Sequence, residues 1–97
     1  MRETLIADDF RPHLGRNFRP AGWPDALVFV SLDAMSQSNW TGPSRQPFFL
    51  ILRGPRERIL PEGEYRFEVE GAEPLDLHIM PIHTLAEGHQ DYQIAFN

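Results

Sequence analysis

The sequence lacks cysteine and lysine entirely, so that all nine of its lysine-or-arginine positions are arginine. Without cysteine the chain has no disulfide, no thiol catalysis and no cysteine metal site. Without lysine it has no Walker-type phosphate lysine, no Schiff base and no lysine general base. No apolar run approaches the ~18 residues that a membrane span needs, and residues 1–9 lack the apolar stretch of a signal peptide. We therefore expect a cytoplasmic protein that makes no membrane contact.

The composition is that of one globular domain over residues 1–97. Hydrophobic residues make up 41% of the chain and charged residues 24%, values typical of a soluble folded domain. Acidic residues outnumber basic ones by 14 to 9, which gives a net charge of −5. Because the chain is acidic and has no basic stripe, we do not expect it to bind nucleic acid.

Nine prolines and seven glycines divide the chain into short segments. The first segment predicts a short helix that Pro12 interrupts, because proline lacks a backbone N–H donor, and that Gly15 ends. Beyond it, apolar and polar residues alternate with the period of two that half-buried antiparallel strands show. We expect strands over 17–20, 26–35, 47–53, 64–70, 74–82 and 91–96. The sequence predicts an all-β domain, either a small antiparallel barrel or a two-layer sandwich of about six strands, with a short N-terminal helix.

Two of these strands carry apolar residues on both faces. Phe29 lies on the face opposite to Val28 and Leu32, and Phe49 and Ile51 lie on the face opposite to Phe48. A strand that is apolar on both faces needs cover on both. Phe29, Phe49 and Ile51 are therefore candidate interaction residues, covered either by another protein chain or by apolar residues of the N-terminal segment (Leu5, Ile6, Phe10 and Leu14).

The polar loop over residues 36–46 contains one large aromatic residue, Trp40, followed by Arg45. Tryptophan and arginine are enriched at interaction hot spots, and loops on a rigid scaffold often carry function. Alternatively, Trp40 folds back and fills one end of the barrel with its N–H satisfied. Trp40 and Arg45 are therefore candidates for a second contact with a partner.

Three arginines, Arg53, Arg56 and Arg58, cluster around a Gly-Pro turn. Arginine side chains suit bidentate acceptors, so the cluster is a candidate anion or phosphate site. The alternative is a solvated turn in which each guanidinium group pairs with a nearby carboxylate.

The sequence carries no recognisable catalytic or metal motif. Four histidines are present at positions 13, 78, 83 and 89, but without cysteine a metal site would also need carboxylates at matching positions. There is no Gly-x-Ser-x-Gly elbow, and the presence of serine, histidine and aspartate does not make a triad. We expect no enzyme activity, no metal and no cofactor.

Several motifs, in this order, resemble the bacterial family of unknown function DUF6916. They are the segments 47–55 (PFFLILRGP), 60–65 (LPEGEY), 75–82 (LDLHIMPI) and 92–97 (YQIAFN). The chain departs from the family pattern at Phe49, where a small polar residue is expected, and its 36–46 loop is longer. The resemblance implies no activity. It implies a small structural or assembly accessory of a phage-tail-like system, because family members occur beside genes for tail-collar or microcystin-dependent-type tail fibre proteins.

These observations predict a non-enzymatic protein-interaction or assembly module. The expected partner is a tail-collar or fibre-type protein, or a second copy of the chain. A small-ligand or anion-binding β-barrel that uses the three arginines is the alternative function.

Overall fold

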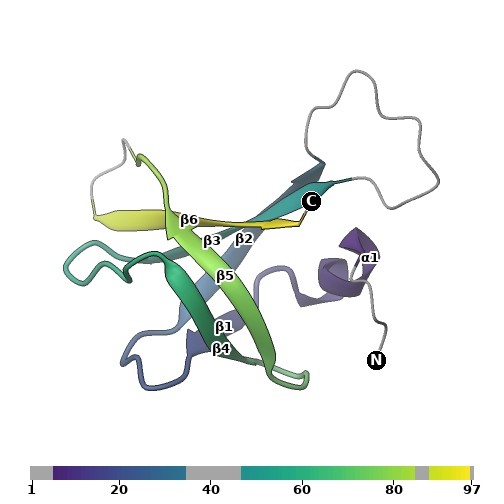
Figure 1. The fold of residues 1–97 in the computed structure, drawn as a ribbon, viewed down its shortest axis with the longest axis horizontal. Coiled ribbons are helices and arrows are strands. Elements are labelled where there is room, and N and C mark those ends of the chain that lie inside the picture. The colour runs from purple at the N-terminus through teal and green to yellow at the C-terminus, as the bar shows by residue number, and fades with distance from the viewer. Residues whose placement is uncertain (1–5, 35–46, 85–87, 97) are drawn as a thin grey trace.

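The computed structural model describes residues 6–34, 47–84 and 88–96, and the fold is a closed antiparallel β-barrel with a short N-terminal helix (Figure 1). Of the two predicted architectures, the barrel is confirmed. The helix α1 spans Ala7–Phe10 and continues into a 3₁₀ turn, η1, over Arg11–His13. The strands are β1 (Asn17–Pro20), β2 (Leu27–Ala34), β3 (Phe48–Pro55), β4 (Gly63–Val69), β5 (Leu75–Pro81) and β6 (His89–Phe96).

The strands follow the order β1-β2-β3-β6-β5-β4 around the barrel, and every pairing is antiparallel. Consecutive strands form most of the pairs, as the short turns predict. Two pairings join distant parts of the chain: β1 with β4, and β3 with β6. The β3–β6 pairing is the longest, with an unbroken register from Phe48↔Phe96 to Pro55↔His89.

The core fills the barrel interior with side chains from alternate positions of the strands. On β3, for example, Phe48, Leu50 and Leu52 are buried, whereas the residues between them are partly exposed. Such alternation places one face of each strand on a common core. The other buried apolar residues are Phe10, Phe18, Leu27, Phe29, Leu60, Phe67, Val69, Leu77, Ile79, Tyr92 and Ile94.

A β-bulge interrupts the alternation of β2. Phe29 pairs with Leu52 and Ser31 with Ile51, so that Val30 is one extra residue in β2 relative to β3. One extra residue in a strand moves the side chains that follow it to the opposite face. As a result Leu27, Phe29 and, beyond the bulge, Leu32 all contact the core. The prediction that Phe29 and Leu32 lie on opposite faces is therefore wrong.

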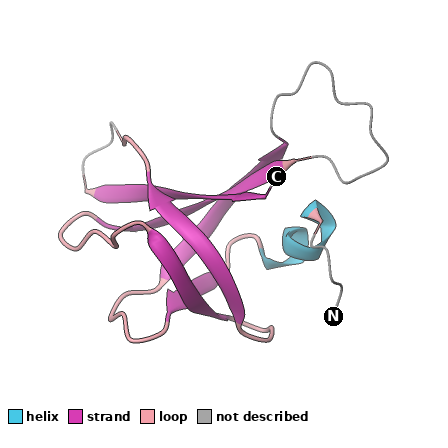
Figure 2. Ribbon diagram, viewed as in Figure 1, coloured by secondary structure: helices cyan, strands magenta, loops and turns pink. Residues whose placement is uncertain are grey.

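The N-terminal helix lies at one end of the barrel (Figure 2). Its first turn is closed by Asp9, whose carboxylate accepts a hydrogen bond from the Ile6 N–H at 2.8 Å. Pro12 lies in η1, and Gly15 follows with φ of 86°, so the predicted interruption and stop are confirmed. Phe10 is 1% exposed and packs on Phe96 with ring centroids 5.1 Å apart. The helix thus closes the barrel mouth with an aromatic ring.

Candidate functional site

The outer surface of β3 carries two of the predicted interaction residues. Phe49 and Ile51 are half-buried and point away from the core, since they alternate with buried neighbours. Phe49 lies between Asp33 of β2 and Ala95 of β6 in the register. β3 therefore carries apolar side chains on both of its faces, as the sequence predicts.

Further apolar side chains lie on the same side of the sheet. Ile51 pairs with Gln93 of β6, and Gln93 pairs in turn with Met80 of β5, whose exposure is 37%. Val28 on β2 is 38% exposed and lies opposite Arg53. We call Phe49, Ile51 and Met80 the β3 outer face. It spans β3 and β5 with the polar Gln93 between them.

Phe29 does not belong to this surface. Its side chain is fully buried, and its ring packs edge-on against Phe18 at 5.5 Å between centroids. The physical reason is the bulge at Val30, which lets Phe29 and Leu32 both face inward. The prediction of Phe29 as an interaction residue is thus corrected, because a side chain inside the barrel is unavailable to a partner.

Two of the N-terminal residues that were expected to cover the β3 outer face, Phe10 and Leu14, do not pack on it. Phe10 contacts Phe48 and Phe96, which belong to the closed mouth of the barrel, and Leu14 is 53% exposed. Leu5, another residue expected to provide cover, lies outside the described residues. Trp40 and Arg45, the candidates in the 36–46 loop, lie outside them as well.

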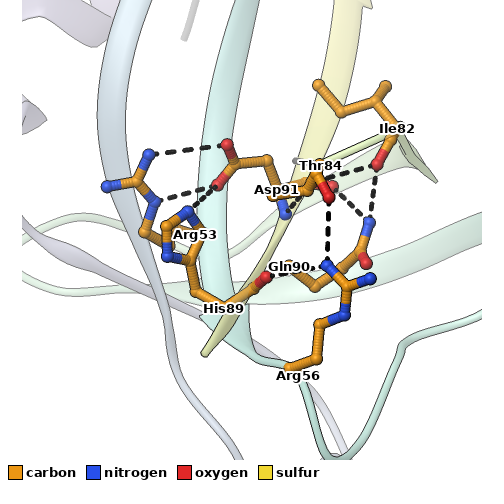
Figure 3. Close-up of polar contacts among 7 residues, drawn as sticks. All are labelled: Arg53, Arg56, Ile82, Thr84, His89, Gln90 and Asp91. Carbon is orange, nitrogen blue, oxygen red and sulfur yellow. Dashed lines mark hydrogen bonds and ion pairs between the residues drawn. The ribbon is translucent and has the colours of Figure 1, made fainter. Parts of the chain in front are cut away.

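Arg53 forms an ion pair at the border of the β3 outer face (Figure 3). It lies opposite Asp91 in the β3–β6 register, and its Nε and Nη2 atoms donate to the two Asp91 carboxylate oxygens at 2.9 and 3.4 Å. The hydrogen bond to Asp91 raises the pKa of the Arg53 guanidinium further above its ordinary value. His89 approaches the same carboxylate at 3.7 Å. Arg53 is therefore charged and already engaged.

The other two arginines of the predicted cluster have different partners. Arg56 donates to the backbone carbonyls of Thr84 and His89 at 3.2 and 3.3 Å (Figure 3). Arg58 donates to the Asp25 carboxylate at 3.0 Å. Arg56 thereby ties the β3–β4 loop to the β5–β6 connection, and Arg58 ties it to the β1–β2 loop. The three guanidinium groups hold separate contacts instead of converging on one point.

A buried tyrosine underlies this end of the barrel. The Tyr92 hydroxyl accepts a hydrogen bond from the Leu60 N–H at 2.9 Å, and both residues are at most 1% exposed. Burial raises the pKa of Tyr92, the Leu60 hydrogen bond opposes this effect, and the negative charge of Asp25 adds to it. The alternation of Tyr92, Ile94 and Phe96 with polar or small residues predicts the inward position of Tyr92, but nothing in the local sequence predicts Leu60 as its partner.

The histidines do not assemble into a metal site within the described part of the chain. His78 lies 3.2 Å from a Glu62 carboxylate oxygen, and His13 contacts Arg16. Among these residues no group of three or more histidine or carboxylate side chains is placed to hold a metal ion.

Neither described helical segment has the length and apolarity that crossing a membrane requires.

The fold and this surface define a class: a small closed antiparallel β-barrel with an apolar core and further apolar side chains on part of its outside. The chain belongs to the family DUF6916, described as a domain of unknown function, and the match covers residues 5–96. The family membership expected from the sequence motifs is thus confirmed. Neither the comparison with curated proteins nor that with solved structures found a match.

Proposed function

We propose that this protein is a non-enzymatic interaction or assembly module that binds a protein partner through the β3 outer face. The observation that carries the proposal is the position of Phe49 and Ile51, an aromatic and a branched side chain that point out of the barrel and are only half-buried. Full burial of an exposed side chain of this size is worth roughly 1.5–3 kcal/mol. Because both side chains are already half-buried, a partner that covers them completely would gain about half of that for each, which is still a substantial contribution to binding.

The surroundings of these residues match the anatomy of a protein interface. Interfaces place apolar and aromatic side chains at the centre and polar groups at the rim. Here the rim contains the Arg53–Asp91 ion pair on one side and the exposed Asp33 on the other. Arginine is itself enriched among residues that dominate binding energy.

We further propose that the partner is a component of a phage-tail-like assembly, of the tail-collar or fibre type, which the protein serves as an accessory. The support is the family membership together with the neighbourhood of tail genes that the family resemblance implies. A contact between two copies of the chain through the same face is the alternative outcome of the experiment below.

The test compares the wild-type protein with the double variant Phe49→Asp/Ile51→Asp. Tagged versions are recovered from the native host, and the bound proteins are identified and quantified by mass spectrometry. Size-exclusion chromatography with light scattering then gives the oligomeric state, and circular dichroism checks the fold. We expect a folded double variant that loses a tail-type partner present in fixed proportion with the wild type.

A matched control is the double variant Leu14→Asp/Ile59→Asp, which places the same charges at two apolar positions that are 53% and 46% exposed outside this face. It should retain the partner. If the Phe49→Asp/Ile51→Asp variant unfolds, the face is covered within the chain, and the proposal is wrong. Retention of the partner by a folded double variant also contradicts it.

A further inference from the structure

The barrel is closed by a short pairing between β5 and β6. Only Met80↔Gln93 and Pro81↔Tyr92 are paired there, although β5 begins at Leu75 and β6 ends at Phe96. From this point β5 stays paired with β4, and β6 stays paired with β3, while the two strands diverge (Figure 1). Among the described residues, the next hydrogen-bonding pair in this register, His78↔Ala95, is not formed.

The direction of the backbone groups at His78 follows from two independent hydrogen bonds. Ile82 N–H donates to the Asp91 carbonyl, so the even-numbered residues of β5 direct their N–H and C=O groups toward β6. On β4, Ala21 N–H donates to the Arg66 carbonyl, so the even-numbered residues there face β1. The odd-numbered residues of β4 therefore bond the odd-numbered residues of β5. The N–H and C=O groups of His78 consequently point toward β6 in the part of the two strands where they are not paired, which we call the seam.

The side chains beside the seam differ between its two faces. On the inner side, Leu75 and Phe96 are only partly buried, although both contact the core. On the outer side, three exposed carboxylates, Glu62, Glu64 and Asp76, lie near His78 and Arg66. Among these five side chains the three carboxylates outnumber the single guanidinium group, so the outer side carries an excess of negative charge.

We propose that the seam between β5 and β6 accepts an extended segment of a partner protein, which adds to β5 as an antiparallel strand. An unpaired strand edge is a template for such pairing, in which main-chain hydrogen bonds provide affinity and alternate side chains provide specificity. The segment carries apolar residues at alternate positions, which meet Leu75 and Phe96. It carries basic residues at the positions between, which meet the carboxylates.

This inference deepens the proposed function and depends on it, because it names the chemistry of the protein partner. The seam is continuous with the β3 outer face, since Ala95 is also the register partner of Phe49. One partner can therefore contact both surfaces.

The first test is hydrogen exchange of the free protein, followed residue by residue by NMR. Leu77 and Ile79 lie in hydrogen-bonding pairs with β4, so their amides should exchange slowly. The His78 amide should exchange much faster than both. Equal protection of all three amides means that the seam is closed, and it overturns the proposal.

The second test measures binding of three synthetic heptapeptides by NMR titration: alternating valine–arginine, alternating valine–glutamate, and valine–arginine with alternate backbone nitrogens methylated. We expect the first to bind and to shift the His78 and Ala95 amides. The methylated peptide keeps the charge but loses backbone donors, so its affinity should fall by about tenfold or more. Equal binding of both arginine peptides overturns strand addition, and preference for the glutamate peptide overturns the charge assignment.

Two variants isolate the backbone contribution in the protein. His78→Pro removes the N–H that faces the seam, whereas His78→Ala removes the same side chain and keeps the N–H. Binding of the valine–arginine peptide should weaken about tenfold in His78→Pro and remain unchanged in His78→Ala. Equal binding to both variants contradicts the proposal, and if His78→Pro fails to fold, the exchange test still decides it. A host partner that is lost with Phe49→Asp/Ile51→Asp but retained with His78→Pro supports the proposed function and rejects the seam.

Discussion

The hydrogen bond between Leu60 and Tyr92 makes the most direct prediction of stability. Replacing Tyr92 with phenylalanine keeps the ring and removes the oxygen that accepts the Leu60 N–H. Because Leu60 is 1% exposed, water cannot readily replace that oxygen. A buried donor left without a partner costs about 1–3 kcal/mol. For a domain of this size, each kcal/mol lowers Tm by roughly 4–8 °C, so we expect a decrease of about 4–24 °C.

A matched control is available in the same chain. The Tyr65 hydroxyl donates to the Pro61 carbonyl at 2.8 Å, but this contact is exposed. Tyr65→Phe should therefore change the free energy of unfolding by less than about 0.5 kcal/mol. Urea denaturation, followed by circular dichroism, gives both values. Equal effects of the two substitutions would refute the argument that burial of the Leu60 N–H makes its bond to Tyr92 important.

The same residue predicts how stability depends on alkaline pH. Burial, more than any other effect, raises the pKa of Tyr92 above its ordinary value of 10.0. As pH rises past 10, the unfolded state loses this phenolic proton while the folded state retains it, so unfolding becomes more favourable. The contribution is intact below pH 10 and is lost as pH rises through the folded pKa. The urea midpoint should fall between pH 8 and pH 11 by more in the wild type and in Tyr65→Phe than in Tyr92→Phe.

Two further predictions concern packing and ligands. Gly54→Ala should destabilise the barrel by about 1–3 kcal/mol in urea denaturation, because the added Cβ would overlap the buried Leu27 side chain. Gly63→Ala is the control: its added Cβ meets only ordinary contacts at 3.5 Å or more, so this substitution should be tolerated. A neutral Gly54→Ala would show that Leu27 moves aside freely. Thermal-shift assays with phosphate, sulfate and sugars should give no stabilisation, because Arg53, Arg56 and Arg58 already hold separate acceptors. A concentration-dependent rise in Tm that Arg53→Gln abolishes would instead support the anion-binding alternative.

The sequence was sufficient to predict the fold class because its strands obey a simple period. β4 alternates apolar and charged residues, and β5 alternates apolar residues with Asp76 and His78. The turns around Gly63 and Gly71 separate these strands from their neighbours. The outward position of Phe49 and Ile51 was also predictable, since β3 has no irregularity. Periodicity alone could not show whether the sheet closes, because closure depends on the β1–β4 and β3–β6 pairings, which join strands that are far apart in the sequence.

The position of Phe29 could not be predicted, because the bulge at Val30 has no clear local signal. Val30 is β-branched and fits a regular strand, so the sequence predicts a single alternation along β2, and only the pairing with β3 shows the bulge. The partners of the arginine side chains could not be predicted from the sequence either. Arg53 pairs with Asp91, 38 residues later, and Arg58 with Asp25, 33 residues earlier. Such partners are set by barrel topology, which sequence spacing does not reveal.

The order of strands also bears on how the chain folds during synthesis. β6 is made last of the six strands, yet it lies between β3 and β5 in the barrel. Until it leaves the ribosome, the longest pairing of the barrel cannot form, and β3 exposes an unpaired apolar edge. Unpaired edges of this kind favour association between nascent chains. The barrel is therefore expected to complete its folding only after β6 has emerged, so a ribosome-bound chain that ends before His89 should be sensitive to protease.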